Sequence, residues 1–558
     1  MIEKLFVKSV ITYGVLLSVL SCRSSGDAVN TRETSVRINL LGSGFIQEGT
    51  LGPQATTNSL KINNTKEHQQ VLALNEDYKL VAVLYPDNAQ PFDTSQASLK
   101  AATPPLKESN NLGYGIKYKV VVYDGNGRYI TEKDYVSGEE RNASPITGLN
   151  GGYTYTFVAY SVGSKSVLPS VTYPDQANKT LASASVEEIP GSSDLMYFSK
   201  TMEITGNNTN YLDVVFSHQF SQITVYLDAT PTQWYNITNL KGVGISPHHN
   251  KAKMLMNNGS IVPEHQTTDG AVVNFPVLNS KSVKADPVYV NTNKVTNGVF
   301  AIQTILMTHQ NDTPVSLQNI TLNDLNITPG VRYNLKISLQ PNDKYLSYRG
   351  YQAVRLSGMI WMRHNLGANL IADPDVPTQQ INGDYYQFGK KTAAANVTTP
   401  ANSISKWDIS SAPNDAWNSG SFLVAVKTAN DPCPDGWRLP TNREINALDK
   451  GTNKSTAGTV QNSATNYSAA KVLTSVFDPS IKMTIPFSGY RSASDGTLLS
   501  RGERGGFWSA TPNFSNATQA VQWALYDMHP INNNYPWATR SEAVSVRCIA
   551  TFPLDREY

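Results

Sequence analysis

The apolar residues between positions 34 and 340 come in short runs that alternate with polar residues, and this pattern is the strongest restriction on the fold. Alternation with a period of two places every second side chain on one face, as in a β-strand with one buried side. A sustained helical period is almost absent upstream of residue 340. We therefore expect two successive β-sandwiches, with a seam near residues 190–205. The clearest runs are residues 36–40, 118–123, 153–160, 212–216, 223–227, 299–306 and 333–339.

A four-residue turn separates two of these runs. It reads Asp124, Gly125, Asn126 and Gly127. Glycine and asparagine accept the positive φ values that tight hairpin turns require. We expect the flanking residues to pair as a β-hairpin, from 120–123 to 128–131.

An apolar segment that ends at Cys22 opens the chain. Lys4 and Lys8 precede or flank the apolar residues 10–20, and Ser21 stands directly before Cys22. This order is typical of a signal peptide over residues 1–21 with a lipoprotein-type cleavage site, after which the Cys22 thiol is acylated. The apolar core has about a dozen residues, whereas roughly 20 span a bilayer. We expect an outer-membrane lipoprotein precursor at the cell surface; the alternative is a signal peptide cut elsewhere, with an incidental thiol at Cys22.

The composition narrows the class of protein. Hydrophobic residues make up 40% of the chain and charged residues 16%, which suits exported β-structure. The net charge is +2 and no basic block is present, so nucleic-acid binding has no support. With roughly 100–200 residues per domain, we expect an N-terminal β-sandwich over 22–200, a second one over 201–342 and a third domain over 343–558.

The third region differs in character. Seven of the eight tryptophans lie at or beyond Trp361. Thr441 precedes a helical pattern over residues 442–450, and Glu444 stands three residues after it, which predicts a capping box. We therefore expect an α+β domain at the C-terminus.

Several segments resemble the fimbrillins, the lipoprotein-derived pilus subunits of Bacteroidetes-type bacteria. They are residues 151–156 with 159–161, residues 216–225 and residues 328–335. The resemblance implies tandem transthyretin-like sandwiches exported as a lipoprotein. It also implies that a trypsin-like protease removes the first strand, leaving a groove for a C-terminal strand of the next subunit.

Strand removal has a physical rationale. It exposes an apolar slot and unpaired sheet edges, and a donated strand restores both the core and the hydrogen-bond ladder. Residues 35–41 are the expected first strand, and the polar segment 42–70 contains Lys61 and Lys66 as cleavage points. The alternative is that a loop of this polarity is nicked without functional consequence.

The C-terminal region carries a second, more specific resemblance. Over about residues 350–552 it is similar to the Fibrobacter succinogenes major paralogous domain, which implies a C-type-lectin-like fold. The motifs that carry this resemblance are residues 361–368, 384–389, 431–441, 488–491, 506–511 and 545–548.

Cys433 and Cys548 remain as an even pair once Cys22 is lipidated. In an oxidising compartment this favours a disulfide over two unrelated buried thiols. Trp437 and Trp508 are expected to pack around it as core residues.

Catalytic motifs are missing from the sequence. Residues 436–441 resemble a signature of the formylglycine-generating oxidases, but those enzymes need redox-active or metal-ligating cysteines, and both cysteines here are assigned to structure. We therefore predict no enzyme and no cofactor, with an oxidase as a remote alternative. His248 and His249 lack a third metal ligand nearby, and the lectin calcium triplets are absent, so no metal is predicted. His218 is expected to tie a strand to a loop.

These features together predict a pilus tip adhesin. The sandwiches would dock on stalk pilins by donor-strand exchange, and the C-terminal domain would bind a surface glycan or protein; membrane attachment through Cys22 would precede processing. The alternative is a non-polymerising outer-membrane lipoprotein that binds glycan or protein. The ligand contacts are expected in polar, loop-like stretches: Asn414, Trp417, Tyr535 and Trp537.

Overall fold

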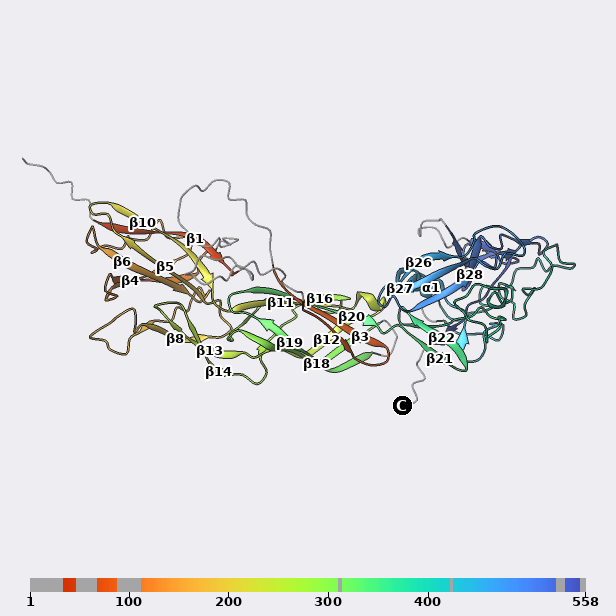
Figure 1. Ribbon diagram of the computed structural model, residues 1–558, viewed down its shortest axis with the longest axis horizontal. Coiled ribbons are helices and arrows are strands. Elements are labelled where there is room, and N and C mark those ends of the chain that lie inside the picture. The colour runs from red at the N-terminus through yellow and green to blue at the C-terminus, as the bar shows by residue number, and fades with distance from the viewer. Residues whose placement is uncertain are drawn as a thin grey trace, which may run out of the picture.

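The computed structural model describes residues 34–46, 68–87, 112–309, 314–421, 425–527 and 537–551. Three bodies built mainly of strands lie in a row along the long axis of the molecule (Figure 1). Within the described ranges the only α-helix is α1, and two single-turn 3-10 helices accompany it. The prediction of a mainly β chain is confirmed. The helical elements are α1 (Asn442–Lys450), η1 (Thr230–Thr232) and η2 (Gln379–Ile381).

The first body contains a six-stranded and a four-stranded sheet, which share a buried cluster that includes Tyr123, Tyr160 and Met254. The other face of the six-stranded sheet carries a second cluster, which includes Phe157 and Phe216. The larger sheet runs β1 (Ser35–Gly44), β10 (Thr209–His218), β9 (Met196–Glu203), β6 (Thr154–Ser161), β4 (Lys117–Asp124) and β5 (Tyr129–Val136). The smaller sheet runs β14 (Ile261–Gln266), β13 (His249–Leu255), β8 (Ser185–Pro190) and β7 (Val171–Thr172).

The predicted hairpin is present between β4 and β5, which pair antiparallel. The Asp124 carboxylate accepts hydrogen bonds from the backbone N–H groups of Asn126 and Arg128, at 2.9 and 2.8 Å. Gly127 adopts φ 76°, a left-handed conformation that glycine enters without a Cβ penalty. Local turn chemistry therefore determines this element.

The second body is a sandwich of two sheets around one apolar cluster, to which both sheets contribute. Leu80 and Leu335 line it from one sheet, and Ile245, Phe300 and Leu322 from the other. One sheet runs β16 (Ser282–Lys284), β11 (Ser221–Asp228), β20 (Arg332–Pro341), β3 (Tyr78–Pro86) and β2 (His68–Ala73), and β17 (Val288–Val290) also pairs with β11. The other runs β15 (Ala271–Val272), β12 (Asn236–Ser246), β18 (Val295–Thr308) and β19 (Val315–Ile327).

The first two bodies are interleaved in sequence, which corrects the predicted division at residue 200. β2 and β3 precede that position but belong to the second body, whereas β10, β13 and β14 follow it and belong to the first. β9 crosses the expected seam at residues 190–205 and lies inside the first sheet. Membership of a sheet depends on hydrogen bonds between segments far apart in sequence, and composition does not report these.

The third body begins at β21, directly after β20 of the second body ends at Pro341, so the expected boundary at 342/343 falls between sheets. One of its sheets runs β21 (Lys344–Tyr348), β22 (Tyr351–Leu356), β23 (Met359–Met362), β35 (Ile549–Ala550) and β25 (Trp437–Arg438). A second runs β24 (Tyr386–Gln387), β34 (Ala543–Val544), β29 (Tyr490–Arg491) and β30 (Leu498–Leu499). A third sheet runs β26 (Thr452–Ala457), β27 (Ala470–Ser475) and β28 (Lys482–Pro486). A fourth runs β31 (Arg504–Pro512), β32 (Gln519–Tyr526) and β33 (Trp537–Thr539).

The second and third bodies are joined by direct polar contacts. Arg355 of β22 forms an ion pair with Asp77, which lies beside β3, and also donates to the Glu76 carbonyl at 2.9 Å. Lys79 of β3 donates to the Phe477 carbonyl at 2.9 Å. The ends of β3 and β22 therefore meet where the two bodies touch.

Candidate functional site

The first strand, β1, lies at an edge of the six-stranded sheet and pairs in parallel with β10 from Ser35 to Gly44. Val36 and Ile38 point inward and are almost fully buried, whereas Asn39 is exposed. The register shifts between Leu40 and Gly42, so the ladder contains a bulge at this point. β1 therefore supplies apolar side chains to the core while it forms a ladder with only one complete neighbouring strand.

A second segment touches β1 on its other side. Val36 and Ile146 exchange backbone hydrogen bonds of 2.8 and 2.9 Å, and Ile146 is 3% exposed. Ile146 follows β5, which lies at the opposite edge of the same sheet. β1 thus closes the gap between β10 and the segment that follows β5.

The end of β1 contacts both the first and the second body. Phe45 stacks on the His218 ring at 3.8 Å between ring centroids, and the Arg332 guanidinium lies 4.5 Å from the centroid of the Phe45 ring. His218 Nδ1 is 2.6 Å from Asp194 Oδ1, and its Nε2 is 3.2 Å from Ser43 Oγ. His218 therefore ties β10 to a loop and to the first strand, which agrees with the structural role expected of it.

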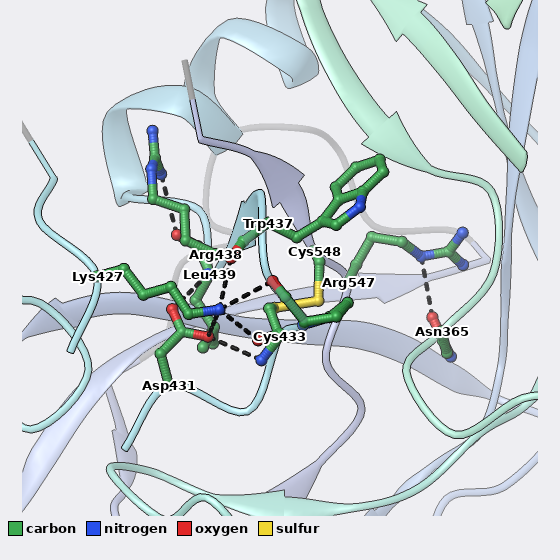
Figure 2. Close-up of a disulfide and its surroundings, with 10 residues drawn as sticks. Asn365, Lys427, Asp431, Cys433, Trp437, Arg438, Leu439, Arg547 and Cys548 are labelled. Atoms are coloured by element: carbon green, nitrogen blue, oxygen red, sulfur yellow. Dashed lines mark hydrogen bonds and ion pairs between the residues drawn. A yellow bond between two sulfur atoms is a disulfide. The ribbon is translucent and has the colours of Figure 1, made fainter. Parts of the chain in front are cut away.

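The disulfide between Cys433 and Cys548 is present, with an S–S distance of 2.08 Å (Figure 2). It closes a sequence separation of 115 residues. Trp437 and Trp508 are fully buried in the same apolar cluster as the two cysteines, which is the core role expected of them.

A buried polar network surrounds this disulfide (Figure 2). The Asp431 carboxylate accepts from the backbone N–H groups of Cys433 at 2.8 Å and Leu439 at 2.9 Å. Lys427 Nζ donates to the Trp437 carbonyl at 2.7 Å and lies 3.9 Å from Asp431 Oδ1. Burial raises the pKa of Asp431 to about 6 and lowers the pKa of Lys427. Every one of these contacts is made to the protein itself, so the network holds the loop before β25 in place.

The predicted capping box of α1 is also present. Thr441 accepts from the Glu444 backbone N–H, and Glu444 Oε2 accepts from the Thr441 backbone N–H at 2.7 Å. Arg438 Nη1 donates to Glu444 Oε2 at 2.9 Å. Burial alone would raise the pKa of Glu444, but the Arg438 guanidinium outweighs it and holds that pKa below its usual value.

Trp417 was expected to be an exposed ligand contact, and the structure contradicts this. Its side chain is 1% exposed and packs against Phe388 and Trp508, with ring centroids 4.7 and 6.4 Å away. Its Nε1 donates to the Lys390 carbonyl at 3.3 Å. Asn414 and Asp415 before it are exposed, whereas Trp417 and the following Asn418 are buried, so the indole ring fills the core.

Two of the other expected ligand residues, Trp537 and Asn414, lie on the surface. Trp537 is 51% exposed at the start of β33. Asn414 is exposed and accepts a hydrogen bond from buried Arg540. Tyr535 lies outside the described residues, as do Cys22, Lys61 and Lys66. Of the four expected ligand contacts, the structure therefore places only Trp537 and Asn414 at the surface of its described residues.

The described residues contain no group of three or more His, Cys, Asp or Glu side chains that could hold a metal ion. His248 is buried, and its Nδ1 accepts from the Asn291 backbone N–H at 3.2 Å. His249 Nδ1 lies 3.2 Å from the Asn291 carbonyl oxygen. Both rings are thus engaged with the backbone beside them. Among the residues that the structure describes, no helix has the length and apolarity needed to cross a membrane.

Sequence reasoning missed the partners of the first strand. Phe45, Ile146 and Arg332 come from three separate parts of the chain, and only folding brings them to β1. The sequence offers one weak signal of a contact beyond the first strand. Phe45 and Ile46 form an apolar pair directly after Gly44, past the alternating residues 36–40.

Comparison with known proteins gives one family match. Residues 354–550 match the family described as the Fibrobacter succinogenes major domain, which confirms the resemblance inferred for the C-terminal region. No curated protein sequence matches the chain.

Solved structures similar to this chain include Bacteroidetes fimbrial and adhesion proteins. A candidate cell adhesion protein from Bacteroides fragilis is 14% identical, covers 57% of this chain and 96% of its own, and has a TM-score of 0.30. The fimbrial anchor protein Mfa2 from Porphyromonas gingivalis is 10% identical, with coverages of 44% and 88% and a TM-score of 0.25. A fimbrial assembly protein from Parabacteroides distasonis is 9% identical, with coverages of 44% and 87% and a TM-score of 0.24.

Proposed function

We propose that this chain is a fimbrial subunit of the tip type, exported as a lipoprotein and assembled by donor-strand exchange, with a C-terminal domain that binds a glycan or protein. In this proposal the first two bodies are fimbrillin-type sandwiches, and the third is a C-type-lectin-like adhesion domain. The observation that carries the proposal is the position of β1, a parallel edge strand whose inward side chains complete the core of the first body.

The geometry of β1 is compatible with removal of this strand and its replacement by a strand of another subunit. Its loss would uncover Leu212, Val214 and Phe216 of β10, which share a cluster with Val36 and Ile38. Burying one such apolar side chain stabilises by roughly 1.5–3 kcal/mol, so an open slot favours binding of another strand. A donor strand needs apolar side chains at alternate positions and a free ladder edge, and β10 offers that edge.

The connection between β1 and β2 is also compatible with removal of β1 by cleavage. β1 ends in the first body, and the next described strand, β2, lies in the second. Cleavage at Lys61 or Lys66 would therefore separate β1 from the rest of the chain before β2 begins at His68. β2 and the second body would keep their connection to the remaining chain.

The tip position is inferred from the C-terminal body. The last strand within the described residues, β35, pairs with β23 and β25 inside a sheet, so it is part of the core of this domain. Donating that strand to another subunit would disrupt the sheet. A subunit that accepts a strand without donating one caps the end of a fibre.

Strand exchange can be tested on the purified chain expressed without residues 1–22. Residues 61–66 are replaced by a site for a specific protease, and the cleaved protein is incubated with a labelled peptide of residues 34–46. We expect the cleaved protein to take up this peptide, and the uncleaved protein to exclude it. A matched peptide with Val36→Asp and Ile38→Asp should not be retained, because both inward side chains would bury a charge. Equal retention of both peptides, or none of either, would contradict exchange at β1.

A further inference from the structure

A cleft of about 550 Å³ lies between the second and third bodies. Gln233, Trp234 and Lys281 line it from the second body, and α1 lines it from the third, with Phe514 beside it. Its volume falls within the roughly 300–1,000 Å³ typical of small-molecule sites. The cleft is distinct from the groove at β1 and from the disulfide.

The cleft has an aromatic wall. Trp234 packs against the apolar clusters of both bodies, and the Arg443 guanidinium lies 4.0 Å from the centroid of its ring. Phe514 is 72% exposed. A large exposed aromatic ring beside a cleft offers an apolar face on which the C–H groups of a sugar ring can stack, because the face of the ring carries negative charge density.

The charge of the lining is entirely positive. Lys281, Arg443 and Lys450 contribute cations, and none of the lining residues is an aspartate or a glutamate. Lys450 is exposed, and so is Lys281, whose ammonium donates to the Gln233 carbonyl at 2.7 Å. Concentrated positive charge in a concave surface attracts anionic ligands and disfavours other cations.

Uncharged polar groups complete the lining. Asn442 and Asn446 are four residues apart on α1, so their side chains lie on the same face of the helix, and Gln233 stands on the opposite wall. These amide groups can form hydrogen bonds with ligand hydroxyl groups.

We propose that this cleft binds a short acidic oligosaccharide. The exposed Phe514 ring would stack on a sugar face, the amides would bond hydroxyl groups, and the ammonium groups of Lys281 and Lys450 would bind the acidic group, while Arg443, which stacks on Trp234 and lies 2.7 Å from His309 Nε2, would add positive charge to the wall. A simple inorganic anion would use the cations but not the exposed Phe514 ring. The proposal rests on the adhesive role proposed above, and it adds the location of the site and the class of ligand.

The experiment begins with the purified chain and an array of acidic oligosaccharides that carry uronate, sialate or sulfate, each printed beside a neutral counterpart of the same backbone. We expect binding to acidic members only, weakening as salt rises. Absence of binding to every acidic member, or equal binding to the neutral counterparts, would overturn the proposal.

The site is then located with charge reversals on exposed side chains, which leave the core intact. Lys281→Glu and Lys450→Glu should each weaken binding of the best acidic oligosaccharide by about tenfold or more. The matched controls are Lys294→Glu in the second body and Lys482→Glu in the third, since both lysines are exposed and lie outside the cleft. These should stay within about twofold of the unaltered chain. Equal losses in cleft and control variants would overturn the location.

Failure of this proposal can be distinguished from failure of the proposed function. Cells whose surface protein carries Lys281→Glu and Lys450→Glu are tested for attachment to the same acidic oligosaccharides. Loss of attachment with intact assembly supports the cleft. Attachment equal to that of unaltered cells overturns the cleft and leaves the adhesive role standing, whereas the peptide-exchange assay tests assembly independently of any sugar.

Discussion

Phe45 lies flat on His218, with ring centroids 3.8 Å apart and an interplanar angle of 4°. His218 belongs to β10, so the residue that follows β1 packs on the end of the strand with which β1 pairs. Arg332 of the second body approaches the same Phe45 ring, and the Ile46 N–H donates to the Gly330 carbonyl at 2.8 Å. The end of the first strand is thus held where the first and second bodies meet, and its release would loosen both contacts.

His218→Leu should destabilise the first body by about 1–3 kcal/mol, because buried Ser43 and the Asp194 carboxylate would each lose a partner. Urea unfolding measures this change. Gln219→Ala is the matched control, since the Gln219 amide bonds only to nearby Ser217 and is expected to change stability little. A His218→Leu chain as stable as the control would show that this histidine does not hold β1.

Replacing Cys433 and Cys548 together by serine should destabilise the third body by about 4–5 kcal/mol, the entropic value for a closed loop of this length. The variant keeps both residues small, removes the covalent link and places two hydroxyl groups in the apolar cluster, whose burial adds to the loss. Guanidinium unfolding with and without a reducing agent provides the measurement. The agent should lower the midpoint of the unaltered chain and leave that of the variant unchanged, and equal midpoints without the agent would contradict a stabilising role.

Glu444→Gln should cost about 3–5 kcal/mol, because it leaves the Arg438 guanidinium buried without its counter-charge. The pKa of Glu444 is held below its usual value, so the stabilisation is present above the ordinary glutamate pKa and is lost as pH falls through the folded-state pKa. Thermal unfolding at pH 7 tests this. Lys450→Gln on the same helix removes an exposed charge and should change the midpoint little.

Acidification should destabilise the fold through His248, which lies between β12 of the second body and β13 of the first. Burial, together with the nearby His249, lowers the pKa of His248 from its ordinary value of 6.5 to about 4. Between these pH values the unfolded chain binds a proton that the folded chain excludes, so stability falls as pH drops from 6.5 to 4, by up to about 3 kcal/mol.

The His248 prediction is tested with His248→Asn, whose Oδ1 can accept from the Asn291 N–H where Nδ1 does now. Unfolding free energies at pH 4 and 6.5 are compared for the two chains. The asparagine variant should show a smaller difference between the two pH values, and an unchanged difference would assign the acid sensitivity to other groups.

Local chemistry made parts of this fold predictable. Asp124 and Gly127 encode the β4–β5 turn through contacts within a few residues, and Thr441 with Glu444 encodes the start of α1 in the same way. The disulfide followed from the export signal and an even number of remaining cysteines. Each of these features depends on neighbours in the sequence or on a simple count.

Features that depend on distant segments could not be predicted in this way. β3 pairs with β20, about 250 residues later, because both strands complete one buried face. Trp417 lies in a polar stretch, yet it packs on Phe388 and Trp508. The cleft also remained hidden, because Trp234 and Arg443 meet only when two bodies are placed side by side.

The most direct test of the central claim reads the N-terminus of the protein by mass spectrometry, in sheared surface appendages and in the membrane fraction. The account predicts that the protein in the sheared fraction begins after Lys61 or Lys66, so that β1 is absent and its groove is available to another subunit. Detection of an acylated Cys22 as the first residue of every copy, in the membrane fraction alone, would contradict it and identify a lipoprotein that keeps its first strand.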